Sequence, residues 1–243
     1  MTSDEEQRRE AEVRGPRSSQ TYSGSPLVTR HLPLFLASSN PGKLREFRAA
    51  AAARGVIVEA LPTYAELPVC VEDGATFEEN ARKKAVHYSR ESSRWVFADD
   101  SGICLEALDG APGVYSARFA GLEATDEQNN ARLLAEIHNV EARRRAQAVN
   151  APRPRGLSHR AAHYICVIAL AEAGEVRTVV EGRADGVIID EPRGAGGFGY
   201  DPYFFYPPLG KTFAEILPEE KFAVSHRGAA FRKLLDYLCT RGQ

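Results

Sequence analysis

The sequence has no apolar run close to the roughly 20 residues that a membrane-spanning helix needs. It also has almost no net charge, because the formal value is −2 at pH 7 over 243 residues. No strong field therefore attracts the chain to nucleic acid or to a charged membrane surface. The first residues are charged and polar and lack the apolar segment of a secretory signal peptide. We expect a cytoplasmic protein with no membrane partner and no stable nucleic-acid partner.

Cysteine is scarce, and its spacing excludes two kinds of site. Cys70, Cys104, Cys166 and Cys239 are scattered along the chain, and no Cys-x-x-Cys pair occurs. This spacing argues against a zinc site and against a disulfide framework, and it is typical of reduced thiols inside a cell.

Two segments contain few large apolar side chains that could form a core. Residues 1–31 are rich in charge, Ser, Gly and Pro, which predicts a disordered N-terminal extension before a single domain at 32–243. Residues 141–160 are rich in Arg, Ala and Pro. Arginines of this kind can neutralise nucleic-acid phosphates, but no aromatic residues lie between them. We therefore interpret 141–160 as a mobile, solvated insertion.

Apolar runs that alternate with amphipathic segments predict an α/β fold. The run at 32–37, the amphipathic stretch before Gly55 and the run at 56–58 form a β-α-β unit. The runs at 162–170 and 176–180 lie too close in sequence to pair in parallel, so the sheet must be mixed.

Helix starts can be predicted at three places. Thr76–Glu79 and Thr125–Gln128 each read as a capping box, with Thr at the N-cap and Glu or Gln three residues later. A last helix is expected from about Ser225, because Phe231 and the leucines after it recur at helical spacing.

The stretch Trp95–Ile103 (WVFADDSGI) is interpreted as an apolar strand that stops at two adjacent carboxylates. At a strand end, Asp99 and Asp100 could both reach one cleft and hold a hard divalent cation such as Mg²⁺. The alternative is a simple turn, since Asp, Ser and Gly all favour turns.

The turn at 38–43 (SSNPGK) is a candidate phosphate site because it leads from a strand into a helix N-terminus. It is not a Walker loop, since the spacing of glycine before Lys43 is wrong. A plain connecting turn is the alternative. Glu72 could join Asp99 and Asp100 around a magnesium ion, although a carboxylate just before a helix is also favourable for structural reasons alone. On that helix Lys84 shares a face with Asn80 and Ala81, and a solvated lysine is the alternative.

Two further segments are candidates for a base pocket. The loop Gly196–Pro202 (GGFGYDP) combines glycines with aromatic rings, which allows a backbone to approach a flat ligand while a ring stacks on it. Lys221, His226 and Arg227 cluster at a predicted helix N-terminus, where cations oppose the helix dipole. An anionic or oxo-bearing ligand would account for that arrangement.

With all of these segments considered together, the chain resembles the inosine triphosphate pyrophosphatase family, the pyrophosphatases of non-canonical purine nucleoside triphosphates. The residues that carry the resemblance occur in the family's order: SSNPGK (38–43), EDGATFEENA (72–81), ADDSG (98–102), GAPGVYSAR (110–118), GGFGYDP (196–202) and KFAVSHRG (221–228). The extension at 1–31 and the segment at 141–160 depart from the family pattern.

The resemblance implies a long twisted mixed β-sheet flanked by helices, with two lobes and a central cleft. It implies Mg²⁺-dependent hydrolysis of ITP, dITP and XTP to the monophosphate and pyrophosphate, by a homodimer. By position, Glu72 and Asp100 would bind the metal, and Asp100 would activate water with Asp99 beside it. Adjacent carboxylates near a metal titrate together, so the sequence does not separate the roles of the two aspartates.

The remaining positions are assigned by the same resemblance. The triphosphate would be held by Ser38, Ser39, Asn40, Pro41, Gly42, Lys43 and Lys84. Ser101 would contact the substrate, and the base pocket would be formed by Phe198, Gly199, Tyr200, Asp201, Lys221, His226 and Arg227. Two other functions are compatible with these residues: a pyrophosphatase for modified pyrimidine nucleotides, and a nucleotide-binding protein without catalysis.

Overall fold

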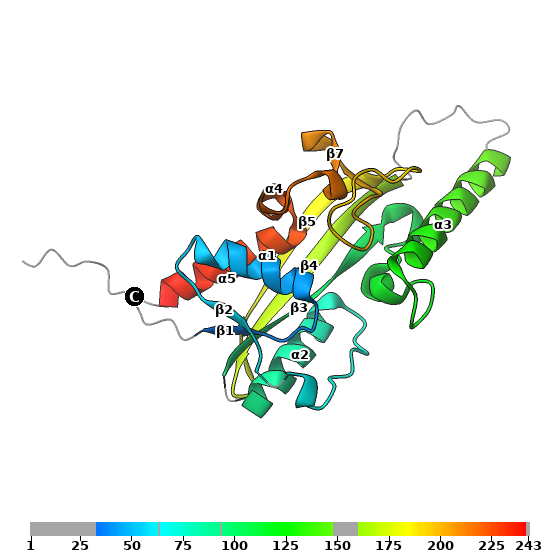
Figure 1. The fold of residues 1–243 in the computed structure, drawn as a ribbon. Coiled ribbons are helices and arrows are strands. Elements are labelled where there is room, and N and C mark those ends of the chain that lie inside the picture. The colour runs from blue at the N-terminus through cyan, green and yellow to red at the C-terminus, as the bar shows by residue number, and fades with distance from the viewer. Residues whose placement is uncertain (1–32, 63, 93, 148–159, 242–243) are drawn as a thin grey trace, which may run out of the picture. The chain divides into compact units, whose positions relative to one another are not determined.

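The computed structural model describes residues 33–62, 64–92, 94–147 and 160–241 (Figure 1). The expectation of a disordered extension at 1–31 lies outside these residues, as does Leu32 at the start of the expected domain.

A seven-stranded sheet runs through the described residues in the order β2-β1-β3-β4-β5-β6-β7 (Figure 1). β1 pairs in parallel with β2 and β3, whereas all other neighbours are antiparallel, which confirms the mixed sheet. The strands are β1 (Leu34–Leu36), β2 (Val58–Ala60), β3 (Trp95–Leu105), β4 (Ala161–Glu172), β5 (Glu175–Ile188), β6 (Phe204–Tyr206) and β7 (Lys211–Thr212).

Capping groups fix where the helices begin. The Asn40 side chain accepts hydrogen bonds from the backbone N–H groups of Gly42 and Lys43 and so starts α1. At α3, Thr125 and Gln128 bond each other's backbone N–H, which confirms that capping box. The helices are α1 (Pro41–Ala52), α2 (Phe77–Ser92), α3 (Asp126–Gln147), α4 (Pro218–Val224) and α5 (His226–Arg241).

The two faces of the sheet are covered by different helices, because successive strand residues point to opposite sides. Phe97 packs in a core with Phe47 of α1 and Phe231 of α5, whereas Val96 and Ala98 pack in another core with residues of α2. A third core surrounds Ile103 at the other end of β3, where residues of α3 and β6 contribute.

The central strand does not stop at the aspartates. β3 pairs with β4 without interruption from Trp95 to Leu105, so the expectation of a strand end or a turn at Asp99 is wrong. β1, in contrast, pairs only with Val96 and Phe97 before the chain turns into α1. Beyond Phe97, one edge of β3 is therefore free of β1, and this edge is the place where the functional residues gather.

The prediction of a mobile insertion at 141–160 is wrong at both ends of this range. Residues 141–147 continue α3, and the buried Arg160 forms ion pairs of 2.8 Å with both Glu141 and Asp190. These pairs hold the end of α3 beside the start of β4. Residues 148–159 lie outside the described part of the chain. Among the helices that are described, none combines the length and the apolar character needed to cross a membrane.

Candidate active site

A cavity of about 290 Å³ lies beside β3, just past the point where β1 ends. Ligands of open α/β sheets commonly bind at such carboxyl ends of parallel strands. The cavity brings together ten of the predicted site residues: Asn40, Lys43, Ser101, Phe198, Gly199, Tyr200, Asp201, Lys221, His226 and Arg227. Gly102, Ser116, Ala117, Asp126, Asn129 and Tyr164 complete its wall.

The other predicted residues of the 38–43 turn shape the turn and do not line the cavity. Ser38 Oγ accepts a hydrogen bond from the Asn40 N–H at 3.2 Å, while Ser39 and Pro41 are exposed. Gly42 lies against the Phe198 ring, at a distance where a Cβ would be 3.8 Å from it. This turn therefore delivers Asn40 and Lys43 to the cavity and places Phe198 beside them.

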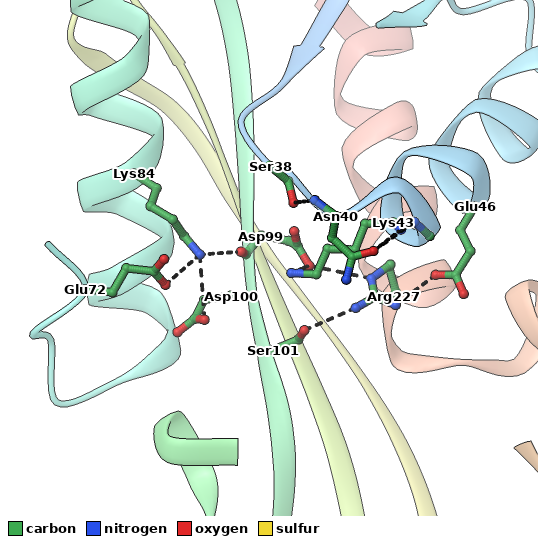
Figure 2. Close-up of polar contacts among 11 residues, drawn as sticks. Ser38, Asn40, Lys43, Glu46, Glu72, Lys84, Asp99, Asp100, Ser101 and Arg227 are labelled. Atoms are coloured by element: carbon green, nitrogen blue, oxygen red, sulfur yellow. Dashed lines mark hydrogen bonds and ion pairs between the residues drawn. The ribbon is translucent and has the colours of Figure 1, made fainter. Parts of the chain in front are cut away.

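Asp99 points to the face of β3 that carries the cations (Figure 2). Its side chain is 1% exposed, and its Oδ2 lies 2.9 Å from Lys43 Nζ and 3.5 Å from Arg227 Nε. Burial alone would raise the pKa of Asp99, but the charges of Lys43 and Arg227 outweigh burial and hold that pKa below its usual range. Asp99 is therefore a charged counterion of Lys43 and Arg227 at neutral pH.

Glu46 is a member of this cluster that the sequence analysis missed. It lies on α1 and binds Arg227 Nη1 at 2.8 Å, with Lys221 Nζ at 3.7 Å from its other oxygen. The position three residues after Lys43 on one helix could have revealed it, since residues at i and i+3 share a face. Arg227 also donates to Ser101 Oγ at 3.3 Å, so the guanidinium is held by groups from α1 and β3 (Figure 2).

Asp100 points to the opposite face of β3, toward α2 (Figure 2). Lys84 Nζ lies 2.8 Å from Glu72 Oε2 and 3.7 Å from Asp100 Oδ1, and it donates to the Asp99 carbonyl at 2.7 Å. Asn80 donates to Asp100 Oδ2 at 3.1 Å. Burial raises the pKa of Asp100, although the Lys84 charge opposes that shift.

Strand geometry thus separates two carboxylates that are adjacent in sequence. The expectation that Glu72, Asp99 and Asp100 surround one cation is wrong, because neighbouring residues of a continuous strand face opposite ways. Within the described residues, no group of three His, Cys, Asp or Glu side chains is placed to hold a metal. Glu72 and Asp100 do converge on one cation, Lys84. Burial would lower the pKa of Lys84, but the carboxylates of Asp100, Asp99 and Glu72 raise it, so the ammonium stays charged.

The glycine-rich loop contributes one exposed ring and two buried anchors. Phe198 is 37% exposed, and its ring centroid lies 5.1 Å from Lys221 Nζ and 5.4 Å from Arg227 Cζ. The buried Asp201 accepts hydrogen bonds from the Phe198 N–H at 2.9 Å and from Lys221 at 2.6 Å. Tyr200 is buried and donates from its hydroxyl to the Ser116 carbonyl at 2.7 Å, so it fixes the loop.

His226 closes the end of the cavity near Tyr164. The two rings stack with their centroids 4.5 Å apart and their planes 7° apart. Burial, together with the neighbouring charges of Arg227 and Lys221, lowers the pKa of His226 well below its ordinary value. The imidazole is therefore neutral near pH 7 and can donate a hydrogen bond from only one of its two nitrogens.

Comparison with known proteins covers all of these segments. The model of the Ham1 family matches residues 34–237, which include every residue of the site described above. The chain belongs to the Ham1 family.

Relatives of this Ham1 family member carry a specific name. This chain is 45% identical over 201 residues to a dITP/XTP pyrophosphatase of Geobacillus kaustophilus, and the alignment covers 83% of this chain and 91% of the relative. It is 44% identical over 209 residues to a dITP/XTP pyrophosphatase of Geobacter sulfurreducens, covering 86% and 98% respectively.

Solved structures confirm the fold. A HAM1 protein from Coxiella burnetii superposes with a TM-score of 0.71 at 36% identity, covering 86% of this chain and 99% of the other. The Staphylococcus aureus Ham1 protein gives a TM-score of 0.69 at 34% identity, covering 86% and 100%. In this Ham1 family member the cavity lies on the face of β3 that carries the cations. Lys84 and its two carboxylates lie on the other face and do not line the cavity.

Proposed function

We propose that this chain hydrolyses non-canonical purine nucleoside triphosphates, namely ITP, dITP and XTP, to the monophosphate and pyrophosphate. Relatives that are 44–45% identical over most of their length are named dITP/XTP pyrophosphatases. The structural observation that supports the proposal most is the open edge of β3, where a basic cavity with an exposed Phe198 lies against Ser101, the strand neighbour of Asp100.

The triphosphate would be held mainly by side-chain charge. Asn40 already occupies the backbone N–H groups of Gly42 and Lys43, so the start of α1 has little free donor capacity there. Lys43 can serve instead, because its side chain is 18% exposed at the cavity and, among the described residues, its one carboxylate contact is Asp99. A phosphate oxygen would share the Lys43 ammonium with that buried carboxylate.

Mg²⁺ belongs to the proposal as the cofactor that Glu72 and Asp100 would hold. The fit is good because Mg²⁺ is usually bound by one or two carboxylates together with substrate phosphates, and these two carboxylates already converge on one cation. When bound, the ion would stabilise negative charge on phosphate oxygens and make a water more acidic.

The water would lose its proton to Asp100. Asn80 occupies Oδ2 of Asp100, which leaves Oδ1 on the side of Lys84 to accept the proton. A raised pKa makes Asp100 a stronger base than an exposed aspartate. Lys84 and Lys43, one on each side of β3, would stabilise the charge that develops on the departing pyrophosphate.

The base would stack on Phe198, which gives affinity for any base and little selectivity. Selectivity would come from Arg227 and the single N–H of neutral His226, which as donors match the 6-oxo group of hypoxanthine or xanthine. The 6-amino group of adenine would face them with its own donors. A buried donor left unpaired costs about 1–3 kcal/mol, which corresponds to about a ten- to hundredfold preference per contact.

Product analysis tests this proposal. With Mg²⁺ present, ITP, XTP, GTP, ATP and dTTP are offered separately, and pyrophosphate and orthophosphate are measured independently. We expect pyrophosphate mainly from ITP and XTP. Orthophosphate as the product would refute the bond assignment, and preference for dTTP would support the alternative of a pyrimidine pyrophosphatase. Binding of ITP without any turnover would support a non-catalytic protein.

A homodimer and a cytoplasmic location complete the proposal. The four cysteines are all unpaired and two of them are buried, which fits a reducing compartment. Light scattering coupled to gel filtration should give twice the mass of one chain, and a monomer at all concentrations would refute the dimer.

A further inference from the structure

The glycine-rich loop is held from outside by helix α3. Gly199 donates from its N–H to Asp126 Oδ2 at 2.6 Å, and its carbonyl accepts a hydrogen bond from Asn130 Nδ2 at 2.9 Å. Asp126 and Asn130 are four residues apart on α3, so their side chains lie on one face of the helix. Both backbone polar groups of Gly199 are therefore bound by a single helical turn.

Asn130 is suited to hold the loop rather than to meet a ligand. It is buried and is absent from the cavity wall, whereas Asp126 does line the cavity. Its amide also donates to the Asp126 carbonyl at 2.8 Å, which fixes the amide against the helix. Gly199 itself has a positive φ of 62°, a conformation that residues with a Cβ rarely adopt.

The same turn of α3 also holds the opposite wall of the cavity. Asn129 accepts a hydrogen bond from the Ala120 N–H at 2.8 Å and donates to the Ala117 carbonyl at 3.2 Å. The Tyr200 hydroxyl then links the two walls through its bond to the Ser116 carbonyl. One helix end thus fixes two loops that approach the cavity from different parts of the chain.

Phe198 lies between two anchors as a result. On one side its own N–H is bound by Asp201, and on the other side Gly199 is bound by α3. Because both flanking peptide groups are bound, the direction in which the Phe198 side chain leaves the backbone is fixed, and the ring lies over the Lys221 and Arg227 cations. An ordered ring stacks with less loss of entropy than a mobile one.

We propose that Asp126 and Asn130 are positioning residues, which fix the Phe198 ring in the orientation that stacks on the substrate base. The proposal rests on the proposed function, because it concerns the base of that substrate. It predicts an effect on base recognition alone, since neither residue contacts Lys43, Lys84 or Asp100 in the described structure.

The test compares a nucleotide with a ligand that has no base. For wild type and Asn130→Ala we would measure kcat and KM with ITP, and the inhibition constant of inorganic tripolyphosphate against ITP. We expect Asn130→Ala to raise the KM for ITP about 5- to 100-fold, the range that loss of base stacking gives. The inhibition constant of tripolyphosphate should stay unchanged, because the ligand lacks a base.

Two further comparisons separate positioning from general damage. Asp126→Ala should repeat the selective rise in KM, whereas Asp126→Asn keeps an acceptor for the Gly199 N–H and should remain close to wild type. This pair keeps the proposal testable if Asn130→Ala does not fold. In a double-mutant cycle, Phe198→Ala combined with Asn130→Ala should raise the KM no more than Phe198→Ala alone.

Each outcome decides the question. Equal weakening of ITP and tripolyphosphate, no change in KM for ITP, or additive effects in the cycle would each overturn the positioning role. A wild-type protein that does not hydrolyse ITP would instead overturn the proposed function, which the wild-type measurement reveals before any variant is compared.

Discussion

Replacing Asp99 and Asp100 one at a time by Asn should produce opposite defects, although the two residues are adjacent. Asp99 is 1% exposed and faces Lys43 and Arg227, at 2.9 and 3.5 Å. Neutralising it leaves the buried Arg227 without one of its counterions. Removing one partner of a buried pair costs about 3–5 kcal/mol. Because Lys43 can turn partly toward water, we expect the lower end, about 3 kcal/mol.

The sign of the pH dependence follows from the shifted pKa. The pKa of folded Asp99 lies below that of the unfolded chain, so its contribution to stability is complete above about pH 4 and is lost only in acid. The loss in Asp99→Asn is therefore fully expressed at neutral pH. For a chain of this size, about 3 kcal/mol corresponds to a fall in Tm of roughly 6–12 °C.

Asp100→Asn should leave stability almost unchanged and should instead lower the turnover of ITP. Burial raises the pKa of Asp100, so the folded protein gains little from the charged form, and a neutral amide should change stability by less than about 1 kcal/mol. Turnover of ITP should fall by about 10²–10⁴-fold, as expected for loss of a general base.

The assay is urea unfolding at neutral pH together with pyrophosphate release from ITP at a temperature where all variants are folded. Asp73→Asn is the matched control, since Asp73 is an exposed neighbour of Glu72 whose one ion-pair partner in the described part of the chain is Lys83. We expect no measurable loss of stability from it. The reasoning is refuted if Asp100→Asn loses as much stability as Asp99→Asn, or if Asp99→Asn unfolds like wild type.

Two other predictions concern α5. Gly182→Ala would place a Cβ 2.1 Å from the His226 carbonyl and 2.3 Å from the Ala230 N–H, so α5 must shift. We expect a loss of about 1–3 kcal/mol in urea unfolding and a lower turnover of ITP, and a variant that equals wild type in both would contradict the packing. Because the pKa of His226 is far below its unfolded value of about 6.5, stability from the neutral imidazole is present above that pH and lost below it. The unfolding free energies of wild type and His226→Gln should therefore converge as the pH falls from about 7.5 to about 5, and a constant difference would rule out the buried neutral state.

Local features of the site could be predicted from the sequence. The turn into α1 follows from Asn40 and Pro41, because an Asn N-cap followed by Pro needs no distant partner. The start of α3 follows from Thr125 and Gln128 for the same reason. The antiparallel pairing of β4 with β5 follows from the short Ala173–Gly174 turn between them.

The sequence by itself thus determined most of the residues that the site contains, because they lie in short motifs of charged, glycine and aromatic residues, but it did not reveal Glu46 or the α3 residues Asp126 and Asn130. Only the tertiary structure decided how these residues are distributed over the two faces of β3 and which of them meet. Asp99 and Asp100 face opposite ways because β4 pairs with β3 beyond them. Glu46 meets Arg227 across 181 residues of chain, and Gly199 meets Asp126 across 73. Such contacts depend on which elements pack together, and no local propensity encodes that packing.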